Sequence, residues 1–510
     1  MVAAGCTPGR GGSQPPTTTV PPRRGGELSV ALVTLRSADP ARAETDAERI
    51  VADSLFDGLT ALDAAGQVVP AVAESWTADA EQRRFEFKLR PSAAFSGGAP
   101  VQAKDFVTAW QRVARSPNPA VRALLNPVKG AAAYTAKTSS RLAGLSAPDP
   151  ATFVVELTEP LADLPALAAD PALAPVPAAA TRPGWAGKPE GNGPFVLEGK
   201  PAPDGLVLTR NETYSGTQPY LDSVRVSIVP DAQTAWLAYQ EGQVQYAPVP
   251  VGQLDAARVL AGEGAGAATI VQGPAAAMDV LGLNGATAPL NNRDRRLAVS
   301  LAIDRERLAA VFGGARVPAD GFVPDGLRRG AAVPCEACEH DPARAKSLLA
   351  GGKMAIKLTI APDPGERRMA ALIAEDLKAA GISVETAEAP AGGVGVLLAE
   401  AGVAVRRATA GAATSTATGF LGAYYDDAST VKVTHLPDRQ LAATIDRAEA
   451  TGSEQVRLQL AGEAEVRAAV SVTAVPLLEY RQTAILAPGV QGFSVSPLGR
   501  VDLGAVSLTG

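Results

Sequence analysis

The chain has 510 residues, of which 46% are hydrophobic, 20% are charged and only 5% are aromatic. This composition is typical of a folded protein, and the length predicts about three domains with cores built mainly of Ala, Val and Leu. The net charge of −6 comes from 47 basic and 53 acidic residues mixed along the chain, so nucleic acid is not an expected partner. Two histidines and three cysteines leave little material for a metal site or for histidine-based catalysis, and no long apolar run predicts a membrane span. We expect no cofactor.

The first 26 residues differ in composition from the rest of the chain. Residues 7–26 are rich in Pro and Gly, so they predict a disordered, partly polyproline-like tether. Small residues precede Cys6, and this arrangement resembles the end of a bacterial lipoprotein signal peptide. We therefore expect lipid on Cys6 to anchor the mature protein to a membrane surface. The alternative is an ordinary disordered terminus that happens to contain a cysteine.

From residue 27 onward, predicted strands and helices alternate. The β-rich run 27–33 predicts a first strand, and residues 45–59 place their large apolar side chains on one helical face. Residues 85–90 alternate as a half-buried strand does, and residues 103–115 have the pattern of an amphipathic helix. Further strands are expected at 152–158, 205–210, 223–229 and 354–361, and further helices at 231–242, 294–312, 342–351, 366–380, 438–449 and 453–470. The alternation predicts an α/β fold.

Residues 390–418 contain almost no large side chain. This composition favours a buried strand followed by a loop of small residues. The alternative is a mobile segment at the edge of a cleft.

Several short segments, in a fixed order along the chain, resemble one protein family. They are Leu55-Phe-Asp-Gly-Leu59, Pro70-Ala-Val-Ala-Glu-Ser-Trp76, Phe95-Ser-Gly-Gly-Ala-Pro-Val101, Gly191-Asn-Gly-Pro-Phe195, Arg210-Asn-Glu-Thr-Tyr214 and Ala302-Ile-Asp-Arg305. No single segment is specific, but their order and spacing are similar to those of the bacterial extracellular solute-binding proteins of ABC importers, family 5, the oligopeptide, dipeptide and nickel type.

These segments have structural roles that are independent of any ligand. We expect Trp76, Phe87, Phe95 and Trp110 to be core aromatics. Asp294 is expected to cap the 294–312 helix, whereas Asp304 inside it is expected to be a surface charge or part of an internal salt bridge.

The resemblance implies an α/β, two-lobed, periplasmic-binding-protein-like clamp with an extra α/β subdomain in the first lobe. After the signal remnant and tether (1–26), we place the first lobe at 27–280 plus 485–510, its extra subdomain at 70–190, and the second lobe at 281–484. The crossovers between lobes are expected near 281–284 and 486–489, where glycines allow the backbone to absorb a hinge motion.

In peptide-binding relatives, an acidic residue of the second lobe holds the α-amino group of the ligand. The matching stretch here is 419–427, in which Phe420 takes the place of a tryptophan and Ala423 takes the place of the acidic anchor. Either the anchor is absent, so that free peptides bind weakly, or a neighbouring aspartate replaces it. The candidate cleft residues are Arg36, Ser37, Asn118, Met278, Phe420, Tyr424, Tyr425, Asp426 and Asp427.

The Cys335-x-x-Cys338 pair lies in an extracellular chain if the resemblance holds, and disulfides persist there. We expect these two cysteines to form a disulfide bond. A redox motif is one alternative, and a metal site that adds His340 and Asp341 is another.

The resemblance implies a binding protein and not an enzyme. We expect it to capture a peptide or another small or medium-sized solute, to deliver it to ABC permease subunits, and to be a lipid-anchored monomer at the extracellular face of the cytoplasmic membrane or in the periplasm. The alternative is a surface lipoprotein on the same fold that binds a lipid or glycan or regulates cell-envelope synthesis.

Overall fold

The computed structural model describes residues 22–63, 66–264, 266–330, 333–389, 402–409, 415–425 and 438–509. Within these ranges, no helix is both long enough and apolar enough to cross a membrane. The buried hydrophobic residues form two large clusters and one small one. One large cluster draws on residues 28–246 and 484–506, and the other on residues 276–478. We call the parts built on these two clusters the first lobe and the second lobe.

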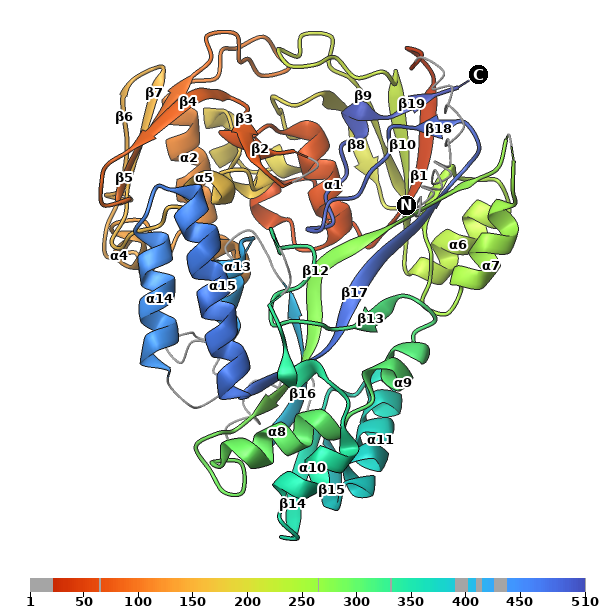
Figure 1. Ribbon diagram of the computed structural model, residues 1–510. Helices are drawn as coiled ribbons and strands as arrows, with labels where there is room; N and C mark the ends of the chain where they lie inside the picture. Colours follow the sequence, from red (N-terminus) through yellow and green to blue (C-terminus); the bar gives the residue numbers. More distant parts are fainter. Residues whose placement is uncertain are drawn as a thin grey trace, which may run out of the picture.

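One mixed sheet runs through both lobes, in the order β15-β14-β16-β12-β17-β11-β1-β10-β9-β8, with β13 paired to β17. Its first-lobe strands are β1 (Glu27–Val33), β8 (Phe195–Ala202), β9 (Gly205–Arg210), β10 (Ser223–Val229) and β11 (Tyr246–Pro248). Its second-lobe strands are β13 (Arg316–Pro318), β14 (Met354–Ile360), β15 (Ile382–Glu388) and β16 (Gly402–Thr409). The long strands β12 (Thr269–Leu283) and β17 (Ala474–Leu486) belong to both lobes. In Figure 1 they run side by side from the upper to the lower part of the molecule.

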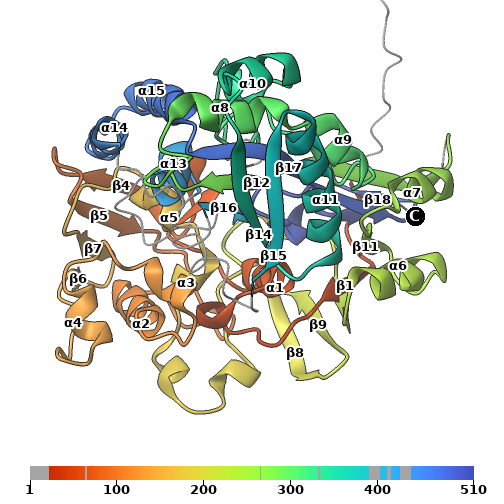
Figure 2. The same ribbon diagram turned by 90° about the horizontal axis from the view of Figure 1, so that it is seen from below.

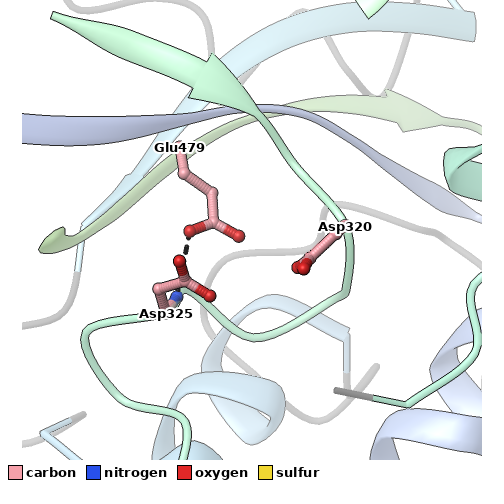
Figure 3. Close-up of side chains that lie close together, drawn as sticks. All are labelled: Asp320, Asp325 and Glu479. Atoms are coloured by element: carbon pink, nitrogen blue, oxygen red, sulfur yellow. Dashed lines mark hydrogen bonds between the residues drawn. The ribbon is translucent and has the colours of Figure 1, made fainter. Parts of the chain in front are cut away.

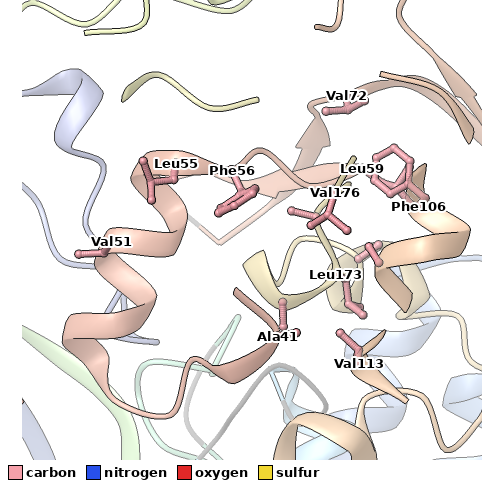
Figure 4. Packing of buried hydrophobic residues seen from close by; sticks show 14 of the residues in the cluster. Ala41, Val51, Leu55, Phe56, Leu59, Val72, Phe106, Val113, Leu173 and Val176 are labelled. Atoms are coloured by element: carbon pink, nitrogen blue, oxygen red, sulfur yellow. The ribbon is translucent and has the colours of Figure 1, made fainter. Parts of the chain in front are cut away.

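The first lobe carries helices α1 (Asp46–Leu55), α6 (Ala232–Gln240) and α7 (Leu254–Ala261). Helix α1 begins with a capping box, in which the Thr45 hydroxyl accepts the Glu48 amide and the Glu48 carboxylate accepts the Thr45 amide. Its buried face, including Val51 and Leu55, packs into the first-lobe core with Phe56 (Figure 4). Two short hairpins complete this lobe: β2 (Thr60–Leu62) with β3 (Val68–Pro70), and β18 (Val490–Gln491) with β19 (Ser507–Leu508).

A four-stranded antiparallel sheet forms a separate layer in the first lobe. Its order is β4 (Ala73–Ala78), β5 (Arg84–Leu89), β7 (Thr152–Glu156) and β6 (Leu145–Asp149). The accompanying helices are α2 (Ala103–Val113), α3 (Pro119–Ala123), α4 (Ala131–Thr135) and α5 (Leu164–Leu167). Phe87, Phe95 and Trp110 are buried here as predicted, and Trp76 is half-buried against Phe87. The extra layer is held by aromatic packing.

The second lobe adds helices to its part of the sheet. They are α8 (Arg293–Ala302), α9 (Arg305–Ala310), α10 (Pro342–Leu348), α11 (Pro364–Ala379), α13 (Ala417–Tyr425), α14 (Arg439–Glu449) and α15 (Glu454–Ser471). Figure 2 shows α11 beside β14 and β15, which it contacts. Helices α13, α14 and α15 pack on one another. Cys335 and Cys338 are joined by a disulfide bond just before α10.

Two predictions of local structure need correction. The single helix expected at 294–312 is two helices: α8 ends at Ala302 with Ile303 in an extended conformation, and Asp304 accepts the Arg307 amide as N-cap of α9. Asn292, and not Asp294, caps α8.

The chain changes from one core to the other inside β12 and β17. Val271 and Ala484 pack with the first-lobe cluster, whereas Ala276 and Leu478 belong to the second. The pairing of the two strands also shifts in register between Pro274 and Met278. The change of core thus falls between Val271 and Ala276 in β12 and between Leu478 and Ala484 in β17. The residue boundaries of the lobes and of the extra subdomain stay a prediction.

Candidate functional site

A cavity of about 250 Å³ lies between the two lobes. The first lobe contributes Leu62, Asp63, Gly66 and Asp163. The C-terminal part of the chain contributes Ser496, Pro497 and Leu498, close to Arg500, which pairs with Asp53 of α1. The second lobe contributes Pro274, residues 325–329, residues 415–418, and Glu454, Arg457, Leu458 and Ala461 of α15. We call this space the interlobe cleft. Because both lobes line it, a ligand held there contacts both lobes at once.

Charged side chains lie along the cleft as pairs. Arg328 contacts Asp320 at 2.7 Å and Asp325 at 3.0 Å, and Arg329 contacts Glu454 at 3.4 Å. Arg481 reaches Asp325 at 3.2 Å. These pairs fix the 319–329 segment against β17 and α15 at one wall of the cleft.

Three carboxylates at this wall come close enough to be considered for a metal ion. Ligand atoms of Asp320, Asp325 and Glu479 lie within 4.8 Å of one another (Figure 3). Glu479 Oε2 accepts the backbone amide of Asp325 at 3.0 Å, and Glu479 Oε1 lies 3.7 Å from Arg328. Burial raises the pKa of Glu479 to about 7. Arg328 lies within 4 Å of all three acids and Arg481 pairs with Asp325, so arginines already offset the charge of this group.

Among the described residues, two groups of contacts join the lobes at the rim of the cleft. Arg329 donates a hydrogen bond to the Gly66 carbonyl. Arg457 of α15 lies 3.5 Å from Asp163, and the Ala162 amide donates to the Glu449 carbonyl at 2.9 Å. The second contact joins the C-terminal end of α14 to the N-terminal end of α5.

A smaller cavity of about 70 Å³ lies next to this second contact. It shares Asp163, Ser415 and Thr416 with the interlobe cleft, so it forms a side chamber of that cleft. Glu449 lines the side chamber and accepts the Thr418 hydroxyl at 3.1 Å. Burial and the charge of Asp163 raise the pKa of Glu449 well above its usual value, and the Thr418 hydroxyl and Arg457 oppose this effect.

Three of the predicted cleft residues are buried in the second-lobe core. Met278 and Phe420 are fully buried, and Tyr425 is 3% exposed. Met278 is on the long strand β12 where it enters the core, and Tyr425 packs against Phe322 with ring centroids 5.4 Å apart. Core packing takes the apolar surface of these side chains, and their role in binding a ligand stays a prediction.

Four other candidates are at the surface or half-buried, and none of them lines the interlobe cleft. Arg36 is exposed and pairs with Glu44, and the Ser37 hydroxyl accepts the Asp39 amide. Asn118 caps α3, and Tyr424 packs against Phe420. Their roles in binding stay predictions.

The remaining candidates, Asp426, Asp427 and Cys6, lie outside the described residues. Ala423, at the position of the expected acidic anchor, is on α13 and offers no polar side chain.

Sequence reasoning missed charged residues that line the cleft, such as Asp163, Arg329 and Arg457, and Glu449, which lines its side chamber. Asp163 precedes the four-residue helix α5. Glu449 is the last residue of the amphipathic helix α14, which also carries the charged residues Asp446 and Arg447. Nothing in the local pattern separates Glu449 from its exposed neighbours. Only the packing of α14 against the first lobe does so.

Two curated proteins and one solved structure show what the chain is similar to. It is 28% identical over 297 residues to the probable deoxycholate-binding periplasmic protein YgiS of Escherichia coli, covering 56% of this chain and 54% of that one. It is 25% identical over 488 residues to the dipeptide-binding protein DppE of Bacillus subtilis, covering 88% and 86%. The unliganded open form of the periplasmic murein tripeptide-binding protein MppA superposes with a TM-score of 0.83 at 22% identity, covering 94% of this chain and 97% of that one.

The fold is the two-lobed clamp that the sequence predicted. The family model for bacterial extracellular solute-binding proteins, family 5 (middle part), matches residues 67–439. The chain belongs to that family, whose members are binding proteins.

Proposed function

We propose that this protein captures a peptide or another medium-sized solute in the interlobe cleft and delivers it to the permease of an ABC importer. The observation that carries the proposal is the cleft itself, which is lined from both lobes in a chain of the solute-binding family. Its wall mixes apolar side chains such as Leu62, Leu327 and Leu458 with charged ones. A cleft of this kind suits a ligand with apolar groups and a few polar anchors.

Native mass spectrometry of the purified full chain tests whether a solute co-purifies, and calorimetry with a library of unmodified tripeptides tests peptides directly. Deoxycholate is the comparison probe, because one relative is named for it. We expect micromolar binding of at least one tripeptide. Deoxycholate binding without any peptide binding would contradict the peptide part of the proposal.

A matched pair of bulky substitutions locates the ligand. Ala461 of α15 lines the cleft, whereas Val466 on the same helix is 47% exposed and does not line it. Ala461→Trp should fill the cleft and weaken binding at least about tenfold, a change of about 1.4 kcal/mol, and Val466→Trp should leave affinity unchanged. Equal affinity of both variants would place the ligand elsewhere.

We also propose that the protein works as a monomer at the outer face of the cytoplasmic membrane or in the periplasm, anchored by lipid on Cys6. The Gly5-Cys6 pair and the Pro- and Gly-rich residues that follow support this. Expressed behind a complete lipoprotein leader, the chain should partition into detergent, and Cys6→Ala should release it. Unchanged partitioning of Cys6→Ala would contradict lipid anchoring.

A further inference from the structure

A second cavity lies within the first lobe, apart from the interlobe cleft. Its volume is about 610 Å³, and the described residues that line it do not include any that line the interlobe cleft. Its walls come from the turn that contains Ala41, the last turns of α2 with the residues that follow it to Pro117, Tyr134 of α4, and residues 180–184. We call this space the arginine cavity, because four arginines line it.

The charge of the arginine cavity is opposite in sign to that of the whole chain. Its wall includes one acid among the described lining residues, Asp39, and the four arginines Arg42, Arg112, Arg115 and Arg182. The wall therefore carries a formal excess of three positive charges, whereas the chain as a whole has a net charge of −6. A hollow lined by charges of one sign concentrates their field and attracts ions of the opposite sign.

The single aspartate does not offset the outer arginines. Asp39 is 2% exposed and accepts a hydrogen bond from Arg112 at 2.6 Å. Arg42 lies 3.8 Å from the same carboxylate. Arg115 and Arg182 are exposed, and among the described residues neither has a carboxylate within 4 Å. Two cationic side chains of the wall are thus open to an anion from solvent.

Aromatic rings hold two of the arginines in place. The guanidinium carbon of Arg115 lies 3.8 Å from the ring centroid of Tyr134, which is buried. That of Arg112 lies 5.0 Å from the ring centroid of Trp185. A guanidinium on the face of a ring keeps its N–H donors at its edge, where they can reach an oxyanion. Within the described part of the chain, the Arg115 side chain donates no hydrogen bond, so its donors are available to a ligand.

Phosphate is the anion that suits this wall best. Arginine binds phosphate through two parallel N–H···O bonds, and a phosphomonoester carries close to two negative charges at pH 7. This charge matches the two arginines that lack a carboxylate. The volume of the cavity is many times the about 30 Å³ of one water molecule, so an organic group fits beside the phosphate. Uncharged residues such as Pro117, Pro183 and Ala186 complete the wall and suit a carbon skeleton.

We infer that the arginine cavity binds the phosphomonoester group of a ligand, with Arg115 and Arg182 as its main contacts. Because the cavity lies apart from the interlobe cleft, binding here does not depend on the solute that the cleft holds. The phosphate has two possible sources, which are a free organic phosphate and the headgroup of an anionic lipid. Both present the same oxygens to the arginines.

Two binding assays with the full chain separate these sources. Calorimetry with sn-glycerol 3-phosphate tests the free phosphate, and glycerol is the uncharged control. Sedimentation with phosphatidylcholine vesicles, with and without phosphatidic acid, tests the headgroup. The vesicle assay uses the Cys6→Ala chain, so that no lipid on Cys6 holds the protein to the vesicles. Binding in both assays should weaken as the salt concentration rises.

Each result of these assays has one meaning. Binding of glycerol 3-phosphate alone identifies a soluble ligand, and capture by phosphatidic acid vesicles alone identifies a lipid headgroup. Binding in both assays shows that the phosphate is recognised in either setting. Binding in neither assay, or equal binding of glycerol, would overturn the inference.

Charge-matched variants test whether the arginine cavity is responsible. Arg115→Gln/Arg182→Gln removes the two arginines that lack a carboxylate. Arg368→Gln/Arg439→Gln removes two exposed arginines of the second lobe. The first double variant should weaken binding at least about tenfold, whereas the second should change it by less than about twofold. Equal effects would mean that general electrostatic attraction holds the phosphate, and would overturn the inference.

The conservative variant Arg115→Lys separates a built site from a patch of positive charge. Lysine keeps the charge but lacks the planar fork that binds two phosphate oxygens, so affinity should still fall about threefold to tenfold. Full affinity in Arg115→Lys would overturn the assignment of Arg115. A melting temperature measured without ligand shows whether each variant is folded. Glycerol 3-phosphate should raise the melting temperature of the wild type and of Arg368→Gln/Arg439→Gln, but not that of Arg115→Gln/Arg182→Gln.

Discussion

At the residue scale, the half-buried acid Asp57 depends on a hydrogen bond from one tyrosine. Tyr214 donates its hydroxyl to Asp57 Oδ2 at 2.6 Å, and the Asp57 amide donates to the Asn192 side chain. Burial raises the pKa of Asp57 to about 6, and the hydrogen bond from Tyr214 opposes this rise because it favours the charged form. The Asp57–Tyr214 hydrogen bond should therefore contribute more to the free energy of unfolding above pH 6, where Asp57 is ionised, than below it.

Tyr214→Phe should destabilise the protein in a pH-dependent way. At pH 8 the variant leaves an ionised, buried carboxylate without its donor, at a cost of about 1–3 kcal/mol. At pH 5 Asp57 is protonated, so the loss should be smaller. Urea unfolding at both pH values measures the difference. Tyr220→Phe is the control, because its hydroxyl has no partner among the described residues. A loss that is the same at both pH values would contradict the role given to Asp57.

At the element scale, Asp304 separates α8 from α9. Its side chain accepts the Arg307 amide at 3.0 Å, and its own amide donates to Asp376 of α11 at 3.1 Å. Asp304→Ala should therefore lower the free energy of unfolding by about 1 kcal/mol, the usual cost of losing an N-cap. Asp294→Ala, in the first turn of α8, should cost only a few tenths of a kcal/mol. Chemical denaturation of both variants gives the comparison, and equal losses would argue against the cap.

The same elements show which parts of the fold a sequence pattern can predict. The strands at 205–210 and 223–229 and the helix at 103–115 were placed to within two residues, because hydrophobic period and caps are local signals. The pattern does not predict the break at Asp304. The apolar residues on either side of Asp304 keep a helical spacing whether the aspartate lies inside one helix or caps the start of a second one. Met278 was placed at the ligand and lies in the core. The path of β12 through both lobes is decided by its pairing with β17, about 200 residues away in the chain.

The binding site was harder to predict than the fold for the same reason. Family-like segments such as 95–101 identify the scaffold, whereas the cleft is lined by residues from parts of the chain that are distant in sequence, such as Asp163, Arg329 and Glu449. Each is an ordinary charged residue in its own segment. Their proximity follows only from how the lobes pack.

At the scale of the whole molecule, three acids with raised pKa values give stability a common pH dependence. Burial raises the pKa of Asp57 to about 6 and that of Glu479 to about 7, and it raises the pKa of Glu449 as well. Between the unfolded pKa values near 4 and these folded values, the native state binds more protons than the unfolded state. The free energy of unfolding should therefore fall as the pH rises from about 5 to 8, by at most about 1.4 kcal/mol per pH unit for each group.

Glu479→Gln tests this dependence without losing the hydrogen bond, because the amide oxygen can still accept the Asp325 amide. The variant should flatten the decline, so its stability relative to the wild type should rise between pH 5 and pH 8. Thermal or urea unfolding across that range measures the slope. A slope as steep as that of the wild type would show that Glu479 does not titrate there.

The clamp itself depends on contacts at its rim. Among the described residues, the chain passes between the two cores in β12 and β17, and the register shift near Pro274 marks where their pairing is interrupted. Across the cleft, Arg329 donates to the Gly66 carbonyl while pairing with Glu454 on its own lobe. This arginine links the lobes through one hydrogen bond that is exposed to water. Such a contact contributes little to global stability but biases the lobes toward each other.

Arg329→Ala should therefore loosen the clamp without unfolding it. We expect faster hydrogen exchange at the backbone amides around Gly66, whose own amide donates to the Asp63 carbonyl, and a larger radius of gyration in small-angle scattering of the unliganded protein. The free energy of unfolding should change by no more than about 0.5 kcal/mol. Arg447→Ala is the control, because Arg447 is exposed and its ion-pair partner among the described residues is Glu463, 4.0 Å away on the neighbouring helix of the same lobe. Unchanged exchange around Gly66 in Arg329→Ala would mean that the lobes keep their separation without this contact, and that the Glu449–Ala162 contact at the other end of the rim is sufficient to hold them.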